Sequence, residues 1–361
     1  MRTYKRKLIL TKAQENRLRS WIGACRTVYN LGKEISDRHY AVTGKSIHKY
    51  ELIKQLPELR GCFDWVRDVP NMCLQSSIVN LDKSYSKFFK TMKSGGGFPK
   101  YASKKKYKSI SFRQLRIVGG DIILSKIGIV KTFKDEPILG TPKTATIKIE
   151  PTGFFISIHC DNVPPRFESE NQAIGLDMGI AQFCTDSNGG FIANPKHFKK
   201  YERKLRVENR SLARKKKGSN SWKKQAKRLS LFHHKIGNVR KDFLHKESTK
   251  IAKANSVVYM EDLNVAGMSK NKNLSKHILD CGWGEFRTML SYKTKVIAIN
   301  PAYTSQTCNE CGVKDKVSRI SQSQFACTSC GYIANADHNA AKNIKQWGAL
   351  LDRQREALAC A

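Results

Sequence analysis

The chain has 361 residues, enough for several domains, and carries 66 Lys and Arg against 30 Asp and Glu, a formal net charge of +36. Because such a surplus repels itself unless a polyanion normally binds, nucleic acid is the first candidate partner and an anionic membrane surface the second. No apolar run of about 18 residues is present, and residues 1–6 lack the apolar core of a signal peptide. These absences disfavour membrane and secreted classes and predict a soluble, intracellular protein.

The first 170 residues predict a helical bundle and a β structure. Residues 1–10 alternate apolar and basic, as a strand does, and Thr11 is placed to cap the helix that follows. Apolar residues at helical spacing over 11–92 predict a small bundle. After a Gly-rich breaker, short apolar runs over 93–170 predict an antiparallel barrel or sheet, to which strand 1–10 would also belong. The bundle would then be an insertion.

The second half alternates apolar strands with helical stretches. Strands are predicted at 173–176, 256–260 and 296–299. Between the first two lies a basic stretch, 196–250, with twenty Lys and Arg against four Asp and Glu. Its apolar stripe predicts two antiparallel helices whose other face either contacts phosphate, which we favour, or is merely solvated. The candidate phosphate contacts are Arg214, Lys215, Lys216 and Lys217.

Three carboxylates stand at the ends of these elements. Asp177 ends one apolar strand, Glu261 ends another, and Asp337 opens a helical stretch. One such Asp alone is most often a turn former, but strand ends converge at one edge of a sheet, so we expect the three to meet. Three carboxylates can hold two Mg²⁺ ions about 4 Å apart, one generating the attacking hydroxide and the other stabilising the leaving 3′ oxygen. Strand alternation sends the adjacent Asp262 to the opposite face.

Two CxxC pairs near the C-terminus predict a structural zinc site. The ligands are Cys308, Cys311, Cys327 and Cys330, with a Gly after each second Cys. This spacing is typical of a zinc ribbon holding one Zn²⁺, and a redox dithiol pair is the alternative. Four thiolates leave no open position, so this zinc would not be catalytic. The other seven cysteines are scattered singly, and we expect them to be reduced and mostly buried.

Ordered motifs span nearly the whole chain, at 14–30, 98–100, 175–180, 242–246, 261–264, 301–311 and 327–344. Together they resemble the TnpB (OrfB-type) proteins of bacterial insertion sequences, compact relatives of type V CRISPR effectors. The resemblance implies a multidomain α/β fold, with an N-terminal wedge β-barrel and an RNase H-like RuvC nuclease domain. The implied divisions are 1–10 (first barrel strand), 11–92 (helical recognition bundle), 93–170 (barrel), 171–304 (RuvC, with the basic hairpin 196–250), 305–333 (zinc ribbon), 334–350 (third acidic motif and helix) and 351–361 (tail).

The resemblance also implies an RNA-guided DNA endonuclease. In such enzymes guide pairing reads the target, while the protein reads a short flanking motif. Asp177, Glu261 and Asp337 match the catalytic carboxylates that hold the two Mg²⁺ ions. The residues placed to read the flanking motif are Gln75, Arg113 and Gln114. The implied partners are a guide RNA from the transposon end and target double-stranded DNA. The implied location is the bacterial cytoplasm, with nucleoid association when the protein is bound. A monomer with RNA is the favoured state, and a dimer stays open.

Two features depart from the family pattern. The segment from Lys293 to Pro301 is shorter than in the family and lacks a Trp-x-Gly turn, which would shorten a helix bordering the active site. Asn335 stands where an Asp is common. The shortened segment keeps open an RNA-guided repressor that does not cut. An unguided RuvC-like resolvase or transposase accessory protein is the other alternative, but His233-His234 is not the His-x-His site that strand transfer would need.

Overall fold

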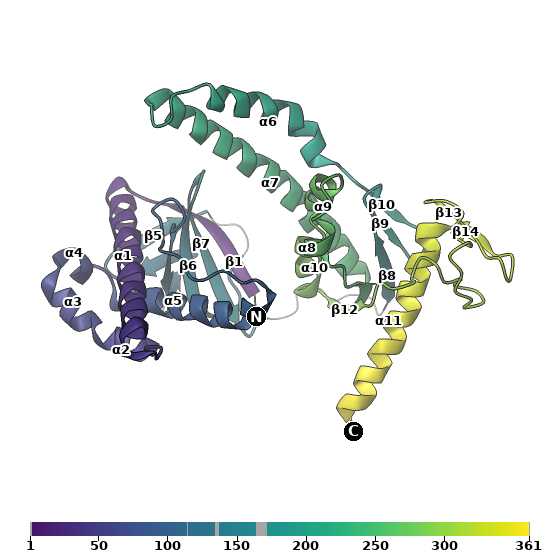
Figure 1. The fold of residues 1–361 in the computed structure, drawn as a ribbon, viewed down its shortest axis with the longest axis horizontal. Helices are drawn as coiled ribbons and strands as arrows, with labels where there is room; N and C mark the ends of the chain where they lie inside the picture. Colours follow the sequence, from purple (N-terminus) through teal and green to yellow (C-terminus); the bar gives the residue numbers. More distant parts are fainter. Residues whose placement is uncertain (1, 114, 134–136, 164–171, 361) are drawn as a thin grey trace. The chain divides into compact units, whose positions relative to one another are not determined.

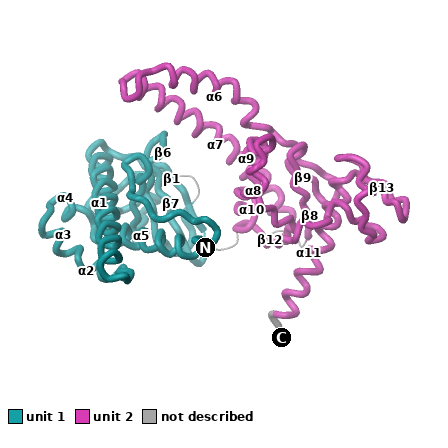
Figure 2. The backbone as a smooth tube through the Cα atoms, viewed as in Figure 1, with its two compact units in different colours: residues 1–164 teal, residues 165–361 magenta. Residues whose placement is uncertain are grey.

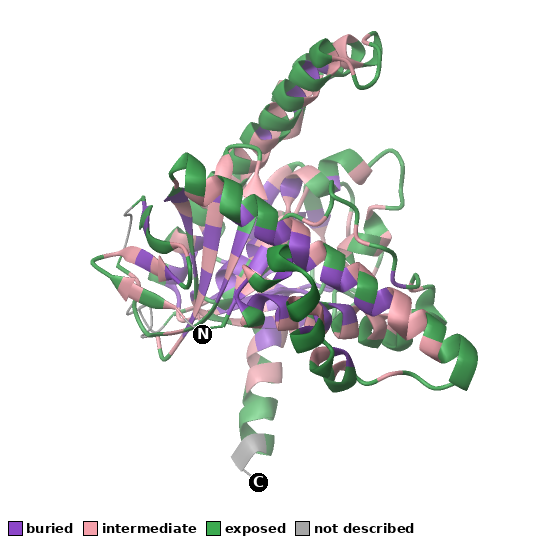
Figure 3. Cartoon of the chain, turned by 90° about the vertical axis from the view of Figure 1, so that its left-hand side faces the viewer, coloured by how far each residue is buried: buried purple, intermediate pink, exposed green. Residues whose placement is uncertain are grey.

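The computed structural model describes residues 2–113, 115–133, 137–163 and 172–360. The side chains of residues 359 and 360 are not described. Gln114 lies outside the described residues. The chain forms two compact units, residues 1–164 and 165–361 (Figure 2). Buried residues gather in the sheets and on the inner faces of the helices (Figure 3). No described helix combines the length and apolar character needed to cross a bilayer.

The first unit combines an antiparallel sheet with a group of helices. Within the described residues, seven strands run in the order β2-β6-β7-β1-β5-β4-β3. The elements are β1 (Arg2–Ile9), α1 (Lys12–Thr43), α2 (Lys49–Lys54), α3 (Leu56–Cys62), α4 (Asp64–Arg67), α5 (Asn71–Thr91), a 3-10 helix (Met92–Ser94), β2 (Ser109–Phe112), β3 (Arg116–Val118), β4 (Asp121–Leu124), β5 (Gly128–Thr132), β6 (Thr141–Glu150) and β7 (Gly153–Asp161).

Strand β1 lies inside this sheet, between β5 and β7, as the sequence pattern predicted. Its side chains alternate, with Tyr4, Arg6 and Leu8 buried. Helices α1 to α5 and the 3-10 helix, which lie between β1 and β2, are therefore an insertion into the sheet. Among the described residues β2 and β3 are its edges, so closure into a barrel stays a prediction.

Helix α1 begins where the sequence predicted. The Thr11 hydroxyl accepts from the Gln14 N–H, and the Gln14 side chain accepts from the Thr11 N–H, which forms a capping box. The helix ends at Gly44, whose φ of 66° suits a left-handed cap. Its apolar face, with Leu18 and Trp21 fully buried, contributes to the core of this unit.

The second unit is built on a mixed sheet. The strands of this sheet that the structure describes run in the order β10-β9-β8-β11-β12. Strands β8, β11 and β12 are parallel, and β9 and β10 are antiparallel to their neighbours. The elements are β8 (Ala173–Met178), β9 (Gln182–Asp186), β10 (Phe191–Ala193), α6 (His197–Ala213), α7 (Asn220–Ala254), β11 (Val257–Glu261), α8 (Val265–Met268), α9 (Ser275–Cys281), α10 (Trp283–Ser291), β12 (Lys295–Ile299), β13 (Gln324–Ala326), β14 (Ile333–Asn335) and α11 (Ala336–Cys360).

The basic stretch forms a long hairpin of α6 and α7, packed side by side (Figure 1). An apolar cluster containing Leu205, Leu229 and Ile236 joins the two helices. Ser219 caps α7, because its hydroxyl accepts from the Trp222 N–H. The apolar stripe is therefore used for packing, and the outer face is left to the basic side chains.

Helix α11 packs directly against the sheet. A Cβ added at Gly175 would come within 2.3 Å of the Ala341 carbonyl oxygen, and one at Gly348 within 2.3 Å of the Tyr259 ring. Such close approach requires glycine at both positions. Residues 351–360 of the expected tail continue helix α11. Lys295 of β12 forms ion pairs with Asp352 and Glu356, which attach the added turns to the strand.

Candidate active site and zinc site

The structure brings the three predicted carboxylates to one cavity. Strands β8 and β11 are adjacent and parallel, and Leu176 of β8 pairs with Met260 of β11. Asp177 and Glu261 are the next residues on the two strands, so they lie side by side. Asp337 lies in the first turn of α11, which packs against β8. The cavity has a volume of about 340 Å³ and is also lined by Thr304, Ser305, Arg319 and Gln322. Three segments that are distant in sequence thus place acidic groups around one space.

Burial and mutual repulsion make this site electrostatically unfavourable for three anions. Burial, followed by the charges of Glu261 and Asp337, raises the pKa of Asp177 to about 7. Burial also raises the pKa of Glu261 and of Asp337 above their ordinary values. The positive charge of Arg319 opposes each of these shifts. A cation bound here would relieve the repulsion.

Two polar residues at this cavity were not singled out from the sequence. The Thr304 hydroxyl donates a hydrogen bond of 2.6 Å to Glu261 Oε1. Arg319 Nη2 lies 3.6 Å from Asp337 Oδ1. Thr304 belongs to the recognised motif at 301–311, so a signal for it existed. Arg319 lies in the loop between the two cysteine pairs, where nothing in the sequence distinguishes it from other basic residues.

The neighbouring acidic residue, Asp262, takes no part in the cavity. It is exposed and forms an ion pair with Arg287. Strand alternation predicted this separation from Glu261. Pro301, at the end of the shortened segment, lines the cavity, whereas none of the described lining residues comes from α10. The effect of the shortening on activity stays a prediction.

Asn335 holds the start of α11. Its side-chain oxygen accepts from the N–H groups of Asp337 (2.9 Å) and His338 (3.1 Å), which fixes the first turn of the helix. The departure from the family pattern at this position therefore has a structural use. It orients the turn that carries Asp337.

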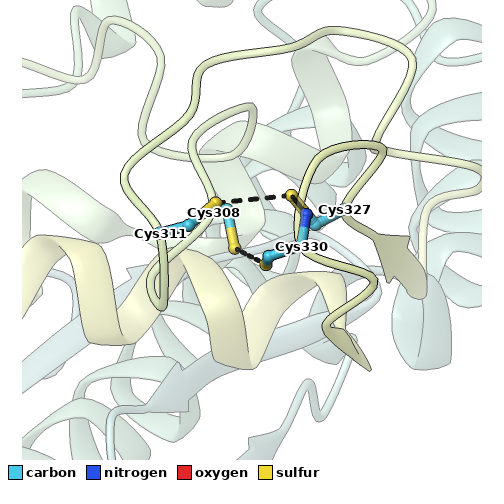
Figure 4. Close-up of side chains that lie close together, drawn as sticks. All are labelled: Cys308, Cys311, Cys327 and Cys330. Atoms are coloured by element: carbon cyan, nitrogen blue, oxygen red, sulfur yellow. Dashed lines mark hydrogen bonds between the residues drawn. The ribbon is translucent and has the colours of Figure 1, made fainter.

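The four predicted zinc ligands form a compact cluster (Figure 4). Cys308 Sγ lies 3.7 Å from Cys330 Sγ, and Cys311 Sγ lies 3.6 Å from Cys327 Sγ. Four sulfurs at the usual Zn–S distance of about 2.3 Å from one ion stand about 3.8 Å apart in a tetrahedron. The cluster therefore fits one tetrahedral Zn²⁺.

Both cysteine pairs have the same backbone geometry. The Gly312 N–H donates to the Cys308 carbonyl (3.0 Å), and the Gly331 N–H donates to the Cys327 carbonyl (3.1 Å). The φ angles of the two glycines are 74° and 73°. This left-handed conformation explains why glycine follows each second Cys.

Two buried asparagines join the ribbon segment to α11. Asn343 Nδ2 donates to the carbonyls of Thr304 (2.9 Å) and Thr307 (2.7 Å). Asn339 Nδ2 donates to the Thr307 carbonyl (2.8 Å), and its side-chain oxygen accepts from the Asn309 N–H (3.0 Å). These bonds explain the two asparagines of the motif that follows Asp337. They tie the cysteine segment, Thr304 and Asp337 into one hydrogen-bonded network.

The predicted nucleic-acid contacts fall into two groups in different units. In the first unit, Gln75 is half-buried on α5, which packs against β2, and exposed Arg113 directly follows that strand. In the second unit, the turn between α6 and α7 carries Arg214, Lys216 and Lys217, all exposed, and half-buried Lys215. The roles of these residues stay predictions.

Family profiles match most of the second unit and the start of the first. The profile of OrfB_IS605, "Probable transposase", matches residues 155–272, and that of "Cas12f1-like, TNB domain" matches 283–344. A profile described as a helix-turn-helix domain matches 1–45. In this chain that segment contains strand β1 and the single long helix α1, so it is not a helix-turn-helix.

Known proteins resemble the chain over most of its length. "Putative RNA-guided DNA endonuclease InsQ" of Escherichia coli (strain K12) is 33% identical, covering 92% of this chain and 88% of that protein. A "Putative RNA-guided DNA endonuclease" of Streptomyces pristinaespiralis is 28% identical, covering 94% of this chain and 82% of that protein. The cryo-EM structure of a Cas12f1-sgRNA-target DNA complex matches with a TM-score of 0.58 at 14% identity, covering 93% of this chain and 83% of that chain, which shows a shared fold. The chain therefore belongs to the TnpB (OrfB-type) family of insertion-sequence proteins.

Proposed function

We propose that this protein is an RNA-guided DNA endonuclease of a mobile element, which cuts target DNA beside a short flanking motif. The observation that carries the proposal is the meeting of Asp177, Glu261 and Asp337 around one cavity. The names of the two relatives, both RNA-guided DNA endonucleases, support the same activity. The net charge of +36 provides for binding of the guide and the target.

The carboxylate cavity fits divalent metal ions with oxygen ligands. Mg²⁺ prefers oxygen ligands, and all three carboxylates line this one space. They would hold two Mg²⁺ ions, with the DNA phosphate completing the coordination. Bound there, the ions would supply activation of the attacking water and neutralise charge on the leaving 3′ oxygen.

The protein residues around the cavity have distinct tasks in this mechanism. Thr304 orients Glu261 through its hydrogen bond. Asp177 must lose the proton that its raised pKa favours before it can act as a metal ligand. Arg319 balances the carboxylate charge in the free protein and, beside Asp337, is placed to meet a phosphate oxygen. Hydrolysis leaves a 5′ phosphate and a 3′ hydroxyl.

The fold of each unit is consistent with the domain assignments implied by the family. The sheet order β10-β9-β8-β11-β12, with its acidic residues on the adjacent strands β8 and β11, supports an RNase H-like RuvC domain over 171–304 and 334–350. Residues 305–333 would be the inserted zinc ribbon. In the first unit, the inserted helices support a wedge barrel with a recognition bundle at 11–92. The proposed complex is one protein copy with a transposon-end guide RNA, acting on DNA in the bacterial cytoplasm.

The direct test compares the unmodified protein with Asp177→Ala, each purified with the RNA transcribed from its own locus. Sequencing that RNA supplies the target for a cleavage assay. We expect one discrete RNA with a constant scaffold, Mg²⁺-dependent cutting of matching DNA, and loss of cutting without loss of binding in Asp177→Ala. Persistent cutting by the variant would refute the site. Heterogeneous RNA would favour an unguided nuclease, and binding without cutting by the unmodified protein would favour a guided repressor.

A further inference from the structure

The helical part of the first unit contains a cavity of about 550 Å³ that has no part in the mechanism above. Its lining comes from α1, α2 and α5 and from the segment that follows α5, and α5 packs against both other helices (Figure 1). Three buried aliphatic side chains, Leu52, Ile78 and Leu81, contribute to this lining. The volume lies in the range of small-ligand sites.

Large exposed apolar side chains gather around this cavity. Tyr40 and Phe89 are 61% and 60% exposed, and Met92 and Phe98 are also at least half exposed. One exposed apolar side chain by itself is ordinary, but four that line the same cavity mark a binding surface. A ligand bound there would remove this apolar area from water.

Two of these residues present open aromatic faces. Tyr40 comes from α1, and no ring or cation among the described residues stacks on it. Phe89 comes from α5, and its described ring contact is a tilted one with Phe88, at 5.3 Å between the centroids. Both rings are therefore free to stack on a planar ligand.

Phe98 forms a fixed wall of the same cavity and opens the recognised motif at 98–100. Its ring meets the rings of Tyr85 and Phe88 edge-on, at 5.7 Å and 5.2 Å between centroids. The Lys33 ammonium lies 4.9 Å from the centroid of the Phe98 ring. These contacts hold the segment after α5 against the helices, so the cavity is formed before any ligand binds.

The charged groups of the cavity are paired, which leaves it nearly neutral. Asp37 accepts from Lys33 Nζ at 2.5 Å and from the Tyr85 hydroxyl at 2.7 Å. Lys49 Nζ donates to Asp82 Oδ2 at 3.3 Å, which leaves Asp82 Oδ1 without a partner among the described residues. A neutral, planar ligand with an N–H donor suits these groups, whereas a free anion does not.

A nucleobase has this chemistry, because it is neutral and planar and carries N–H or amino donors. A folded RNA exposes unpaired bases in its loops and bulges, and proteins bind such bases by aromatic stacking and hydrogen bonds. A DNA duplex keeps its bases paired. A second copy of this chain is a poorer match for the cavity, because each copy carries a net charge of +36.

We infer that this cavity binds an unpaired base of the guide RNA, stacked on Tyr40 or Phe89, with an N–H group donating to Asp82. The inference rests on the proposed function, since that function supplies the RNA. The base would attach the RNA to the helices of the first unit, away from the carboxylates that carry out the cutting.

The test uses the full-length protein purified with the RNA transcribed from its own locus. Ultraviolet light joins a stacked base to the aromatic residue that it contacts, and mass spectrometry of the digested complex identifies the peptide and the nucleotide. We expect one nucleotide of the RNA to be joined to Tyr40 or Phe89. Tyr40→Leu and Phe89→Leu should each weaken RNA binding by about tenfold, and Tyr40→Phe should bind normally.

Tyr50→Leu is the matched control. Tyr50 is also a tyrosine that is 61% exposed, and it lies on α2 but does not line the cavity. Leucine is a good helix former, so the helices should survive these substitutions, and thermal melts verify that they do. Equal weakening of RNA binding in Tyr50→Leu and Tyr40→Leu would overturn the inference, as would adducts with target DNA in place of RNA.

Light scattering covers the other possible occupant. A protein dimer that Phe89→Leu dissociates would assign the cavity to a second copy and overturn the inference. None of these measurements needs cutting, so the two proposals fail separately. An unmodified protein that cuts with its guide but gives no adduct at Tyr40 or Phe89 removes this inference alone. One that gives the adduct but never cuts removes only the endonuclease activity.

Discussion

The cysteine cluster and the carboxylate cavity are two very different sites in one unit. The cysteines come from a single segment, 308–330, and their sulfurs stand within 4.8 Å of one another. The carboxylates come from β8, β11 and α11, and burial, followed by the charges of Glu261 and Asp337, raises the pKa of Asp177 to about 7. The first site is closed and suits a structural ion. The second is an open cavity in which the fold keeps three buried carboxylates close together although their charges repel one another, and it suits an exchangeable ligand.

The two sites are nevertheless coupled. Arg319, from the loop between the cysteine pairs, lies beside Asp337, and Asn339 and Asn343 fasten the same segment to α11. A structural ion can therefore influence the reaction without touching the substrate. The comparison predicts that changes to the carboxylates act mainly on chemistry, whereas changes to the cysteines act first on structure.

The largest expected effect comes from the change of Glu261, and the adjacent Asp262 provides the control. Glu261→Gln should lower the cutting rate by about 10²- to 10³-fold, because a neutral amide holds metal ions poorly and stabilises less charge in the transition state. Asp262→Asn should change it less than about twofold, since it removes only an exposed ion pair with Arg287. Single-turnover cleavage at saturating protein measures both. Equal losses in the two variants would contradict the assignment of Glu261.

Loss of a cysteine should show the coupling. Cys327→Ser should remove bound zinc and unfold the ribbon, which withdraws Arg319 from Asp337 and lowers cutting by about 10- to 100-fold. Cys62→Ser is the control, because Cys62 is an exposed free cysteine of α3 in the first unit. Zinc content and cleavage are measured on the same preparations. Zinc-free protein that cuts at the normal rate would show that the two sites are independent.

The predictability of each site from sequence follows from how it is assembled. The cysteine cluster was predictable because its ligands and glycines are local, and their spacing alone specifies the geometry. The meeting of Asp177 and Glu261 followed from strand ends and recognised motifs. Arg319 was not predictable, because its position depends on how a loop packs, and one arginine among 66 Lys and Arg carries no signal.

The helical conformation of the residues beyond 350 was not predicted, for a similar reason. Leu351 packs against an apolar cluster that includes Tyr259 and Ile297, and Lys295 forms ion pairs with Asp352 and Glu356. Those contacts join segments that are distant in sequence. By contrast, the strand β1 and the Thr11 cap were predictable because alternation and capping are local properties.

A smaller effect is expected from the hydrogen bond that orients Glu261. Thr304→Val removes the hydroxyl but keeps the shape, and should weaken metal binding or cutting by about tenfold. Thr304→Ser retains the hydroxyl and should behave almost as the unmodified protein. The dependence of the cleavage rate on Mg²⁺ concentration separates weaker metal binding from slower chemistry. Equal activity of the valine and serine variants would show that the bond has no part in the reaction.

The smallest effect is on stability and concerns the protonation of Asp177. Its pKa of about 7 lies above the ordinary value of 3.8, so the folded state holds the proton more tightly than the unfolded state. That contribution to stability is full below about pH 4 and is lost as the pH rises through 7. In magnesium-free buffer at pH 8, Asp177→Asn should therefore be more stable than the unmodified protein, by on the order of 1–2 kcal/mol. The advantage should shrink at pH 5.

Added Mg²⁺ should reverse this order, which distinguishes a metal site from a merely strained carboxylate. Metal that binds only the folded state raises its stability, and the unmodified protein should gain more than Asp177→Asn. Thermal melts at pH 5 and pH 8, each with and without Mg²⁺, measure the stability of both proteins under the four conditions. Chelators are omitted so that any zinc stays on the cysteines. A variant that is stabilised at pH 8 but gains equally from Mg²⁺ would leave Asp177 as a repelled carboxylate with no part in metal binding. The open cavity would then differ from the cysteine cluster only in strain and not in function.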